Sequence, residues 1–344
     1  MQDVWRDWWL PLVQAAIRAE ASDIHVTAGQ AAWLRCAGVL TRQGALQPTA
    51  AMLESVLGQM LNTAQRQALR RQRTLDFSWT GEGRRFRGNA YFQQGLPALA
   101  LRLLPAQIPT LTQIGAPPAL ASLVTAEQGF ILVTGRTGAG KTTTLAAFLD
   151  AVNHSRAAHI ITLEDPLEYL YQPDQCFISQ RECGRDFLTF ADALRSALRE
   201  APDIILVGEI RDAATMRMAM MAAETGTLVL GTLHAVRAAE AALRVAGFFP
   251  LAEQELVRAQ LAEVLTGIFA QRLVPATVGG RVAVMEVLLA TPAVRSLIRQ
   301  GKYAQLESVM LGRGGMQTSD MALERLYAAG EISRATRDKY HSPG

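Results

Sequence analysis

A glycine-rich loop is the part of the sequence with the clearest chemistry. The segment GRTGAGKT at 135–142 follows the apolar run FILVT and precedes the helical pattern TTLAAFLDAV. Glycines let backbone N–H groups turn around phosphate oxygens, and the N-terminus of the following helix favours negative charge. Lys141 is expected to contact the β- and γ-phosphates of a nucleotide, and the Thr142 hydroxyl to bind Mg²⁺. The predicted nucleotide-binding residues of this loop are Gly135, Thr137, Gly138, Ala139, Gly140, Lys141, Thr142 and Thr143.

Acidic residues follow two predicted strands. Residues 203–207 (DIILV) predict a buried strand, after which Gly208 stands where such strands usually carry aspartate, and Glu209 comes next. Ligands bind at the carboxyl ends of strands in open α/β sheets, so Glu209 is expected to hold the Mg²⁺ shell or position water. The run HIITL ends at Glu164, which begins the turn EDPLE, and carboxylates there can orient an attacking water. The alternative for both segments is an ordinary acid at a strand end.

His234 follows the predicted strand 227–232. An imidazole at this place can hydrogen-bond the γ-phosphate and report whether it is present. The alternative is a strand-end histidine with no ligand, and the residues alone leave both readings open.

The elements around these motifs change character along the chain. Strand candidates at 23–27, 32–36, 74–79, 85–92 and 98–104, with a helix at about 49–61, predict a small α+β domain over 1–104. Four prolines within residues 105–118 predict a linker. Beyond it, strands alternate with helices, which is typical of βαβ units and a mostly parallel sheet. Residues 119–344 are therefore expected to form one domain, with helices from about 250 to 344.

Composition narrows the function classes. The chain has 344 residues, 49% of them hydrophobic and 19% charged, as in a globular protein. The net charge of +3 does not indicate a nucleic-acid surface, and three scattered cysteines exclude a four-cysteine zinc site. The opening MQDVWRDWWL lacks the apolar core of a signal peptide, and no run reaches the ~20 apolar residues of a spanning helix. We expect a soluble cytoplasmic protein whose N-terminal tryptophans either pack on their own domain or contact a membrane or partner.

Four segments together resemble the secretion-superfamily (GspE/PilT/VirB11-like) P-loop ATPases of type IV pili and type II secretion. GRTGAGKT resembles their Walker A loop, ITLEDPLEY their Asp box, DIILVGEIRD their Walker B segment and ETGTLVLGTLH their His box. ASDIHV, RFRGNAYFQQG, AVRSLIRQGK and GGMQTSDMALERLYAAGEIS also look like the family, so the resemblance covers essentially the whole chain. The short first domain, the absent zinc insertion and AVRSLIRQGK favour the retraction branch, the PilT/PilU type.

This resemblance implies an α/β protein: a small α+β (PAS-like) N-terminal domain and a RecA-like ATPase domain with a helical C-terminal part. It implies ATP and Mg²⁺ as cofactors, with Glu164 as the acid that activates water, Glu209 as the Walker B acid, and Thr142 and Glu209 at the metal. His234 belongs to the His box. Arg87 and Arg102 are the first-domain arginines that would neutralise phosphate charge.

The same resemblance implies a homohexamer that retracts type IV pili in twitching motility. An inner-membrane platform protein is the expected partner, and a paralogous retraction ATPase is a second candidate. Nucleic acid is not expected. The protein would be cytoplasmic and touch the inner membrane only peripherally, through the pilus machine.

Four positions depart from the family pattern. Thr227 stands where the His box has its first histidine, Ser296 and Gln300 replace the asparagine and glutamate of the retraction signature, and Arg136 replaces the P-loop proline. None of them removes a phosphate or Mg²⁺ ligand. They leave open an accessory or paralogous retraction ATPase, an assembly or type II secretion ATPase, and a regulatory hexamer component with slow turnover.

Overall fold

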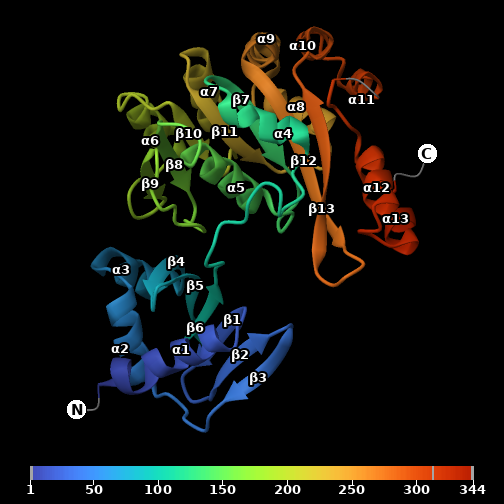
Figure 1. Cartoon of the computed structure of the whole chain (residues 1–344). Coiled ribbons are helices and arrows are strands. Elements are labelled where there is room, and N and C mark those ends of the chain that lie inside the picture. Colours follow the sequence, from blue (N-terminus) through green and yellow to red (C-terminus); the bar gives the residue numbers. More distant parts are fainter. Residues whose placement is uncertain (1–2, 312–313, 342–344) are drawn as a thin grey trace. The chain divides into compact units, whose positions relative to one another are not determined.

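The computed structural model describes residues 3–311 and 314–341, and its contacts divide the chain into two compact units. Unit 1 comprises Met1–Gln107 and Pro166–Leu170, and unit 2 comprises Ile108–Asp165 and Tyr171–Gly344 (Figure 1). The segment 166–170, which the sequence analysis placed with the second domain, thus groups with unit 1. Within the described ranges, none of the helices combines the length and the apolar character needed to cross a bilayer.

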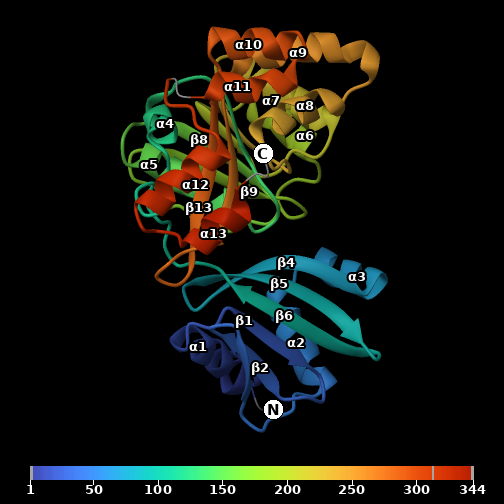
Figure 2. The same cartoon turned by 90° about the vertical axis from the view of Figure 1, so that its right-hand side faces the viewer.

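Unit 1 is a six-stranded antiparallel sheet with helices on one face (Figure 2). Its strands run in the order β3-β2-β1-β6-β5-β4. The strands are β1 (Asp23–Thr27), β2 (Ala32–Cys36), β3 (Val39–Gln43), β4 (Thr74–Gly81), β5 (Arg84–Gln93) and β6 (Leu96–Leu103). The helices are the π-helical turn η1 (Trp5–Trp9), α1 (Leu10–Arg18), α2 (Ala50–Met60) and α3 (Thr63–Gln72). The sequence analysis did not predict β3 or α3.

The N-terminal tryptophans belong to the core of unit 1. Trp9 is fully buried, and Trp5 and Trp8 pack against the same apolar cluster. The ring of Trp79 in β4 lies nearly perpendicular to that of Trp5 at a centroid distance of 5.8 Å, and its centre is 6.2 Å from that of Trp9. Aromatic rings packed in this way stabilise a fold through the apolar area that they bury and through ring–ring contacts. The reading of these residues as packed on their own domain is confirmed.

Unit 2 is a seven-stranded mixed sheet in the order β13-β12-β7-β11-β10-β8-β9. Its strands are β7 (Gly129–Thr134), β8 (His159–Glu164), β9 (Phe177–Glu182), β10 (Ile204–Val207), β11 (Leu228–Leu233), β12 (Leu265–Pro275) and β13 (Arg281–Leu289). All neighbours are parallel except β12 and β13, which form an antiparallel hairpin.

The helical elements of unit 2 lie along and beside this sheet (Figure 1). They are α4 (Pro118–Ala121), η2 (Ser122–Thr125), α5 (Lys141–Asn153), α6 (Phe190–Ala197), α7 (Ala213–Glu224), α8 (Ala238–Gly247), η3 (Leu251–Glu253), α9 (Gln254–Val264), α10 (Pro292–Arg299), η4 (Tyr303–Gln305), α11 (Leu306–Met310), α12 (Ser319–Ala328) and α13 (Arg334–Tyr340).

Burial on both faces explains why the central strands are apolar throughout. Phe130 and Leu132 of β7 belong to the apolar cluster that contains α7, while Ile131 and Val133 are equally buried. Because successive side chains of a strand point to opposite faces, both faces of β7 are covered. The predicted mostly parallel sheet, and with it the α/β fold class, is confirmed.

The expectation of helices from about 250 to 344 is wrong in its central part. Residues 265–289 form the long hairpin β12–β13, which extends the sheet beside β7. Its turn contains Gly279 and Gly280 at φ of 62° and 71°, a conformation that favours glycine. The strand β9 was also not predicted. The helices on either side of the hairpin agree with the expectation.

Candidate nucleotide site

The phosphate loop lies between β7 and α5, as its sequence predicted, and two of its three glycines pack closely against β12. Gly135 has φ of 151° and Gly140 has φ of 87°. A Cβ on Gly135 would lie 2.3 Å from the carbonyl oxygen of Gln271, and a Cβ on Gly140 would lie 2.9 Å from the Gln271 amide nitrogen. Side chains at these two positions would therefore push the loop away from β12.

Lys141 begins α5 and bridges the loop. Its Nζ donates hydrogen bonds to the carbonyl oxygens of Gly135 at 2.8 Å and Arg136 at 3.2 Å. The ammonium group is thus held over the loop whose backbone N–H groups would surround a phosphate. Thr142 follows Lys141 in the first turn of α5, where the Thr142 hydroxyl is available as a ligand for Mg²⁺.

Gln271 supports the loop from β12, and sequence reasoning missed it. Its side chain is only 4% exposed, and its Oε1 accepts a hydrogen bond of 2.7 Å from the Thr144 hydroxyl of α5. The sequence signal that could have indicated Gln271 is a polar residue inside the apolar run LTGIFAQRLVP. Its partner Thr144 could not be inferred, because it lies 127 positions away in sequence. Gln271 fixes the start of α5, and with it the loop, against the sheet.

Glu209 and His234 meet at the carboxyl ends of β10 and β11. Glu209 Oε1 lies 2.7 Å from His234 Nε2, and Glu209 Oε2 lies 2.6 Å from an Arg211 guanidinium nitrogen. Burial acts to raise the pKa of Glu209, but the hydrogen bond and charge of Arg211 and the contact with His234 outweigh it and hold that pKa below its ordinary value. Glu209 is therefore a carboxylate at neutral pH.

Glu164 ends the neighbouring strand β8 and is buried. Its strand packs closely on the turn after β10, because a Cβ on Gly208 would lie 3.0 Å from the Leu163 carbonyl oxygen and 3.2 Å from Glu164 Cα. This close approach explains a glycine where the sequence pattern has aspartate. Across β8 and β9, Glu164 is in register with Glu182, a second buried acid that sequence reasoning missed because it did not predict β9.

The sheet order brings the predicted groups to one edge. Strands β7, β11, β10 and β8 are parallel neighbours, so the phosphate loop, His234, Glu209 and Glu164 all follow the carboxyl ends of adjacent strands (Figure 1). Open α/β sheets bind ligands at this edge. The described residues contain no group of three or more metal-ligating side chains.

Arg87 and Arg102 lie in unit 1, as neighbours on β5 and β6. Arg102 Nε donates to Asp23 Oδ1 at 2.9 Å. Burial acts to raise the pKa of Asp23, but hydrogen bonds from Ser22 and Arg102 outweigh it and lower that pKa. Both arginines are exposed. Their role at the nucleotide stays a prediction.

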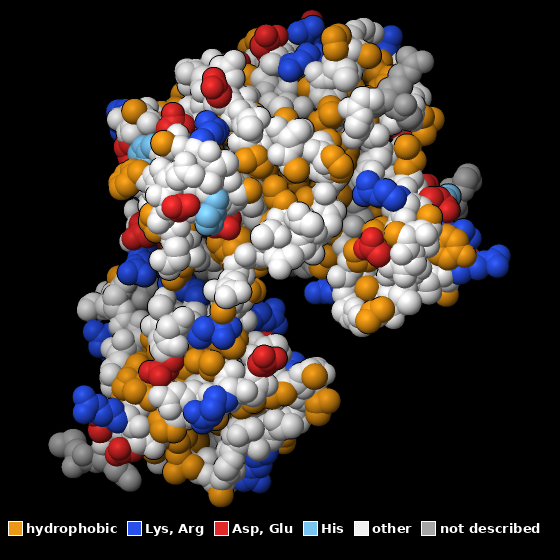
Figure 3. Space-filling model, in the orientation of Figure 1, with side chains coloured by type: hydrophobic (Ala, Val, Ile, Leu, Met, Phe, Trp, Pro, Cys, Tyr) orange, Lys and Arg blue, Asp and Glu red, His pale blue; other side chains and the backbone are white. Residues whose placement is uncertain are grey.

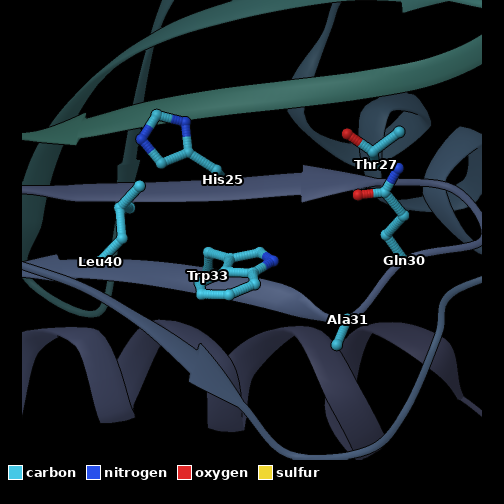
Figure 4. A pocket seen from close by; sticks show the side chains of 6 residues that line it. All are labelled: His25, Thr27, Gln30, Ala31, Trp33 and Leu40. Atoms are coloured by element: carbon cyan, nitrogen blue, oxygen red, sulfur yellow. The ribbon is translucent and has the colours of Figure 1, made fainter.

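Unit 1 has a hollow of its own, of about 240 Å³, on β1, β2 and the chain around them. Figure 4 shows its lining, in which Thr27 and Gln30 lie near the end of β1 and His25 lies across from Trp33 on β2. The lining is His25, Thr27, Gln30, Ala31, Trp33 and Leu40, without a lysine, an arginine or an acid among the described residues. This composition does not suit a triphosphate.

Figure 3 shows how charged side chains are distributed on one face of unit 2. On the face of unit 2 shown in Figure 3, the Lys and Arg side chains of the described residues are scattered among Asp and Glu side chains. Binding to a nucleic-acid backbone depends on clustered basic side chains.

Comparisons with known proteins agree with this arrangement. The chain is 41% identical over 336 residues to the type IV pilus retraction ATPase PilT of Pseudomonas aeruginosa, covering 96% of this chain and 98% of that protein. It is 39% identical over 328 residues to the type IV pilus ATPase PilU of the same organism, covering 94% and 85%. A crystal structure of the pilus retraction motor PilT with bound ADP superposes with a TM-score of 0.90 at 41% identity, covering 97% of both chains. The family model for type II/IV secretion system proteins matches residues 6–322, and the chain belongs to this family.

Proposed function

We propose that this protein is a hexameric ATPase motor that couples ATP hydrolysis to retraction of type IV pili, and so to twitching motility. The observation that carries the proposal is the phosphate loop beside an ionised Glu209 that contacts His234, in a chain similar to PilT along nearly its full length. The motor is cytoplasmic and reaches the inner membrane peripherally, through a platform protein of the pilus machine. Its domains are 1–104 and 119–344, joined by 105–118.

The residues divide the chemistry as follows. The loop N–H groups and Lys141 bind the phosphates, and Thr142 and Glu209 hold Mg²⁺, which when bound neutralises charge on the transferred phosphoryl group. Glu164, buried at the end of β8, orients the attacking water. His234 follows β11 and contacts Glu209. In this position it can hydrogen-bond the γ-phosphate and respond to whether that phosphate is present. Arg87 and Arg102 add positive charge from the first domain.

A Lys141→Ala substitution tests the motor function. We expect it to abolish ATP hydrolysis by the purified chain and to leave cells with excess, unretracted pili. Lys302→Ala is the matched control, since Lys302 lies after α10 outside the site, and it should hydrolyse ATP at the wild-type rate. Wild-type hydrolysis in Lys141→Ala would contradict the proposal. Cells without pili after deletion of the gene would instead indicate an assembly or secretion motor.

A second candidate is an accessory or paralogous retraction ATPase. It is favoured by α10, where Gln300 Nε2 donates to Ser296 Oγ at 3.0 Å, so two departures from the retraction signature pair with each other on an exposed face. Similarity to PilU is nearly equal to that to PilT. The hydrolysis rate of the purified chain, alone and mixed with a paralogue, separates the candidates, because an accessory motor should gain activity only in the mixture.

A further inference from the structure

The chain passes from unit 2 into unit 1 and back again close to Glu164. Glu164 ends β8 in unit 2, residues 166–170 group with unit 1, and the chain returns to unit 2 at Tyr171. We name residues 166–170 the strap. Its two flanks are fixed in unit 2, because Glu164 belongs to a buried strand and the Tyr171 backbone N–H donates to Gln180 Oε1 of β9 at 3.0 Å.

Arg85 of β5 holds the strap on unit 1. Its Nε donates to the Leu167 carbonyl oxygen at 3.4 Å, and its terminal nitrogens donate to the Thr80 hydroxyl at 3.0 Å and the Ser78 hydroxyl at 2.6 Å. Arg85 and Leu167 are both buried. A guanidinium group presents its N–H donors in one rigid plane, so the two hydroxyls of β4 fix the direction of the donor that meets the strap.

The link between this contact and the acid is short and stiff. Glu164 and Leu167 are three positions apart, and Asp165 and Pro166 lie between them. The proline ring fixes its own φ and restricts the residue before it to extended conformations. A link with so little conformational freedom passes a displacement of Leu167 on to the end of β8.

We propose that Arg85 is a positioning residue for Glu164: it holds the strap on unit 1 and so makes the place of the Glu164 carboxylate depend on that unit. The inference rests on the proposed function, in which Glu164 orients the attacking water. Arg85 acts through the strap and not on the nucleotide, since its donors are directed at β4 and Leu167. A misplacement of about 1 Å in a catalytic group can cost about 10²-fold in rate.

The test measures ATP hydrolysis and nucleotide binding by the full-length chain that carries Arg85→Ala. We expect kcat to fall about 10–10²-fold, because the carboxylate no longer holds the water in line. The Kd for MgADP should stay within about twofold, because the phosphate loop is intact. A loss in kcat without a loss in binding is not what general damage to the fold produces.

A double-mutant cycle with Glu164→Gln shows whether Arg85 acts through the acid. Single-turnover rates are compared for Arg85→Ala, Glu164→Gln and the double variant. In the Glu164→Gln background, Arg85→Ala should lower the rate by less than about twofold, because the carboxylate that it positions is already absent. Effects on separate steps would instead multiply.

Pro166→Gly is the second variant, because it loosens the link and leaves Arg85 in place. It should also lower kcat with little change in MgADP binding. It decides the question if a melting curve shows that Arg85→Ala is unfolded. Arg84→Ala is the matched control: Arg84 is the neighbouring arginine of β5 and also donates to a backbone carbonyl oxygen, that of Leu104, at 3.1 Å. This control should hydrolyse ATP at the wild-type rate.

Wild-type kcat in a folded Arg85→Ala protein would overturn the positioning role, and so would losses that multiply in the double variant. If Arg85→Ala is unfolded, wild-type kcat in Pro166→Gly would overturn it. Failure of the proposed function looks different. In that case the wild-type chain would not hydrolyse ATP, or Lys141→Ala would hydrolyse it at the wild-type rate.

Discussion

The two flanks of β7 support the phosphate loop in different ways. Toward β11 and β10, the contacts are made by a partly exposed, ionised carboxylate: Glu209 contacts His234 at 2.7 Å and Arg211 at 2.6 Å. Toward β12, the contact is neutral and buried: Thr144 donates to Gln271 at 2.7 Å. We name these the charged flank and the neutral flank.

The two kinds of contact suit different roles, one in the reaction and the other in holding the loop in place. Partly exposed ion pairs are worth little and can exchange partners when phosphate and Mg²⁺ bind. A buried neutral hydrogen bond does not respond to pH, and breaking one partner leaves a polar group without compensation. The charged flank can therefore rearrange during a catalytic cycle while the neutral flank holds the loop fixed.

The largest expected effect comes from Glu164 and Glu209, the two acids at the carboxyl ends of β8 and β10. Glu164→Gln and Glu209→Gln should each lower the rate of ATP hydrolysis by about 10²–10⁴-fold, because each removes a carboxylate that acts on water or Mg²⁺. The two roles differ in their response to Mg²⁺. Glu209→Gln should raise the Mg²⁺ concentration for half-maximal activity, and Glu164→Gln should leave it unchanged.

Glu253→Gln is the matched control for these variants. Glu253 also pairs with an arginine, Arg217, but it directly precedes α9 and does not follow any of the strands that carry the candidate site. The Glu253→Gln variant should hydrolyse ATP at the wild-type rate. A shifted Mg²⁺ requirement in Glu164→Gln with none in Glu209→Gln would exchange the two roles.

The neutral flank should show a smaller effect, on stability before activity. Gln271→Leu leaves the buried Thr144 hydroxyl without its acceptor, which costs about 1–3 kcal/mol of unfolding free energy. The double variant Gln271→Leu/Thr144→Val replaces both polar partners and should recover much of that loss. Chemical denaturation of the wild type, the single variant and the double variant measures these differences in unfolding free energy. Additive losses in the double variant would contradict a direct contact between the two side chains.

The charged flank was readable from sequence, and the neutral flank was not. Glu209, Glu164 and His234 follow short apolar runs, and strand–helix alternation places such strand ends at one edge of a sheet. Gln271 and Arg272 interrupt the apolar run of β12, so a strand there gave no clear pattern. The importance of Gln271 depends on Thr144, 127 positions away, and no local pattern encodes that contact.

The same limit applies in unit 1. The sequence predicted five of its strands, and the tryptophans of η1 could be read as core residues because aromatic stripes usually are. It gave no sign that Arg85, which is 8% exposed, donates through Nε to the Leu167 carbonyl oxygen at 3.4 Å. This contact ties residues 166–170, which begin two positions after Glu164, to β5. The grouping of residues 166–170 with unit 1 depends on a contact between segments that are far apart in sequence, so local sequence patterns could not predict it.

The smallest expected effect is a pH dependence confined to the charged flank. The pKa of Glu209 lies below its ordinary value of 4.5, so its ion pairs stabilise the fold above that pH and lose this effect as the pH falls through the lowered pKa. Arg211→Ala should cost about 0.2–1 kcal/mol at pH 7, since the guanidinium is largely exposed. Because Glu209 is protonated in both proteins at low pH, the difference in urea midpoint should vanish there. The Thr144–Gln271 contact has no titrating group, so the deficit of Gln271→Leu should persist at both pH values. A deficit of Arg211→Ala that is the same at pH 7 and at a pH well below the lowered pKa of Glu209 would mean that Glu209 does not carry it. The two flanks would then not differ in the way their contacts imply.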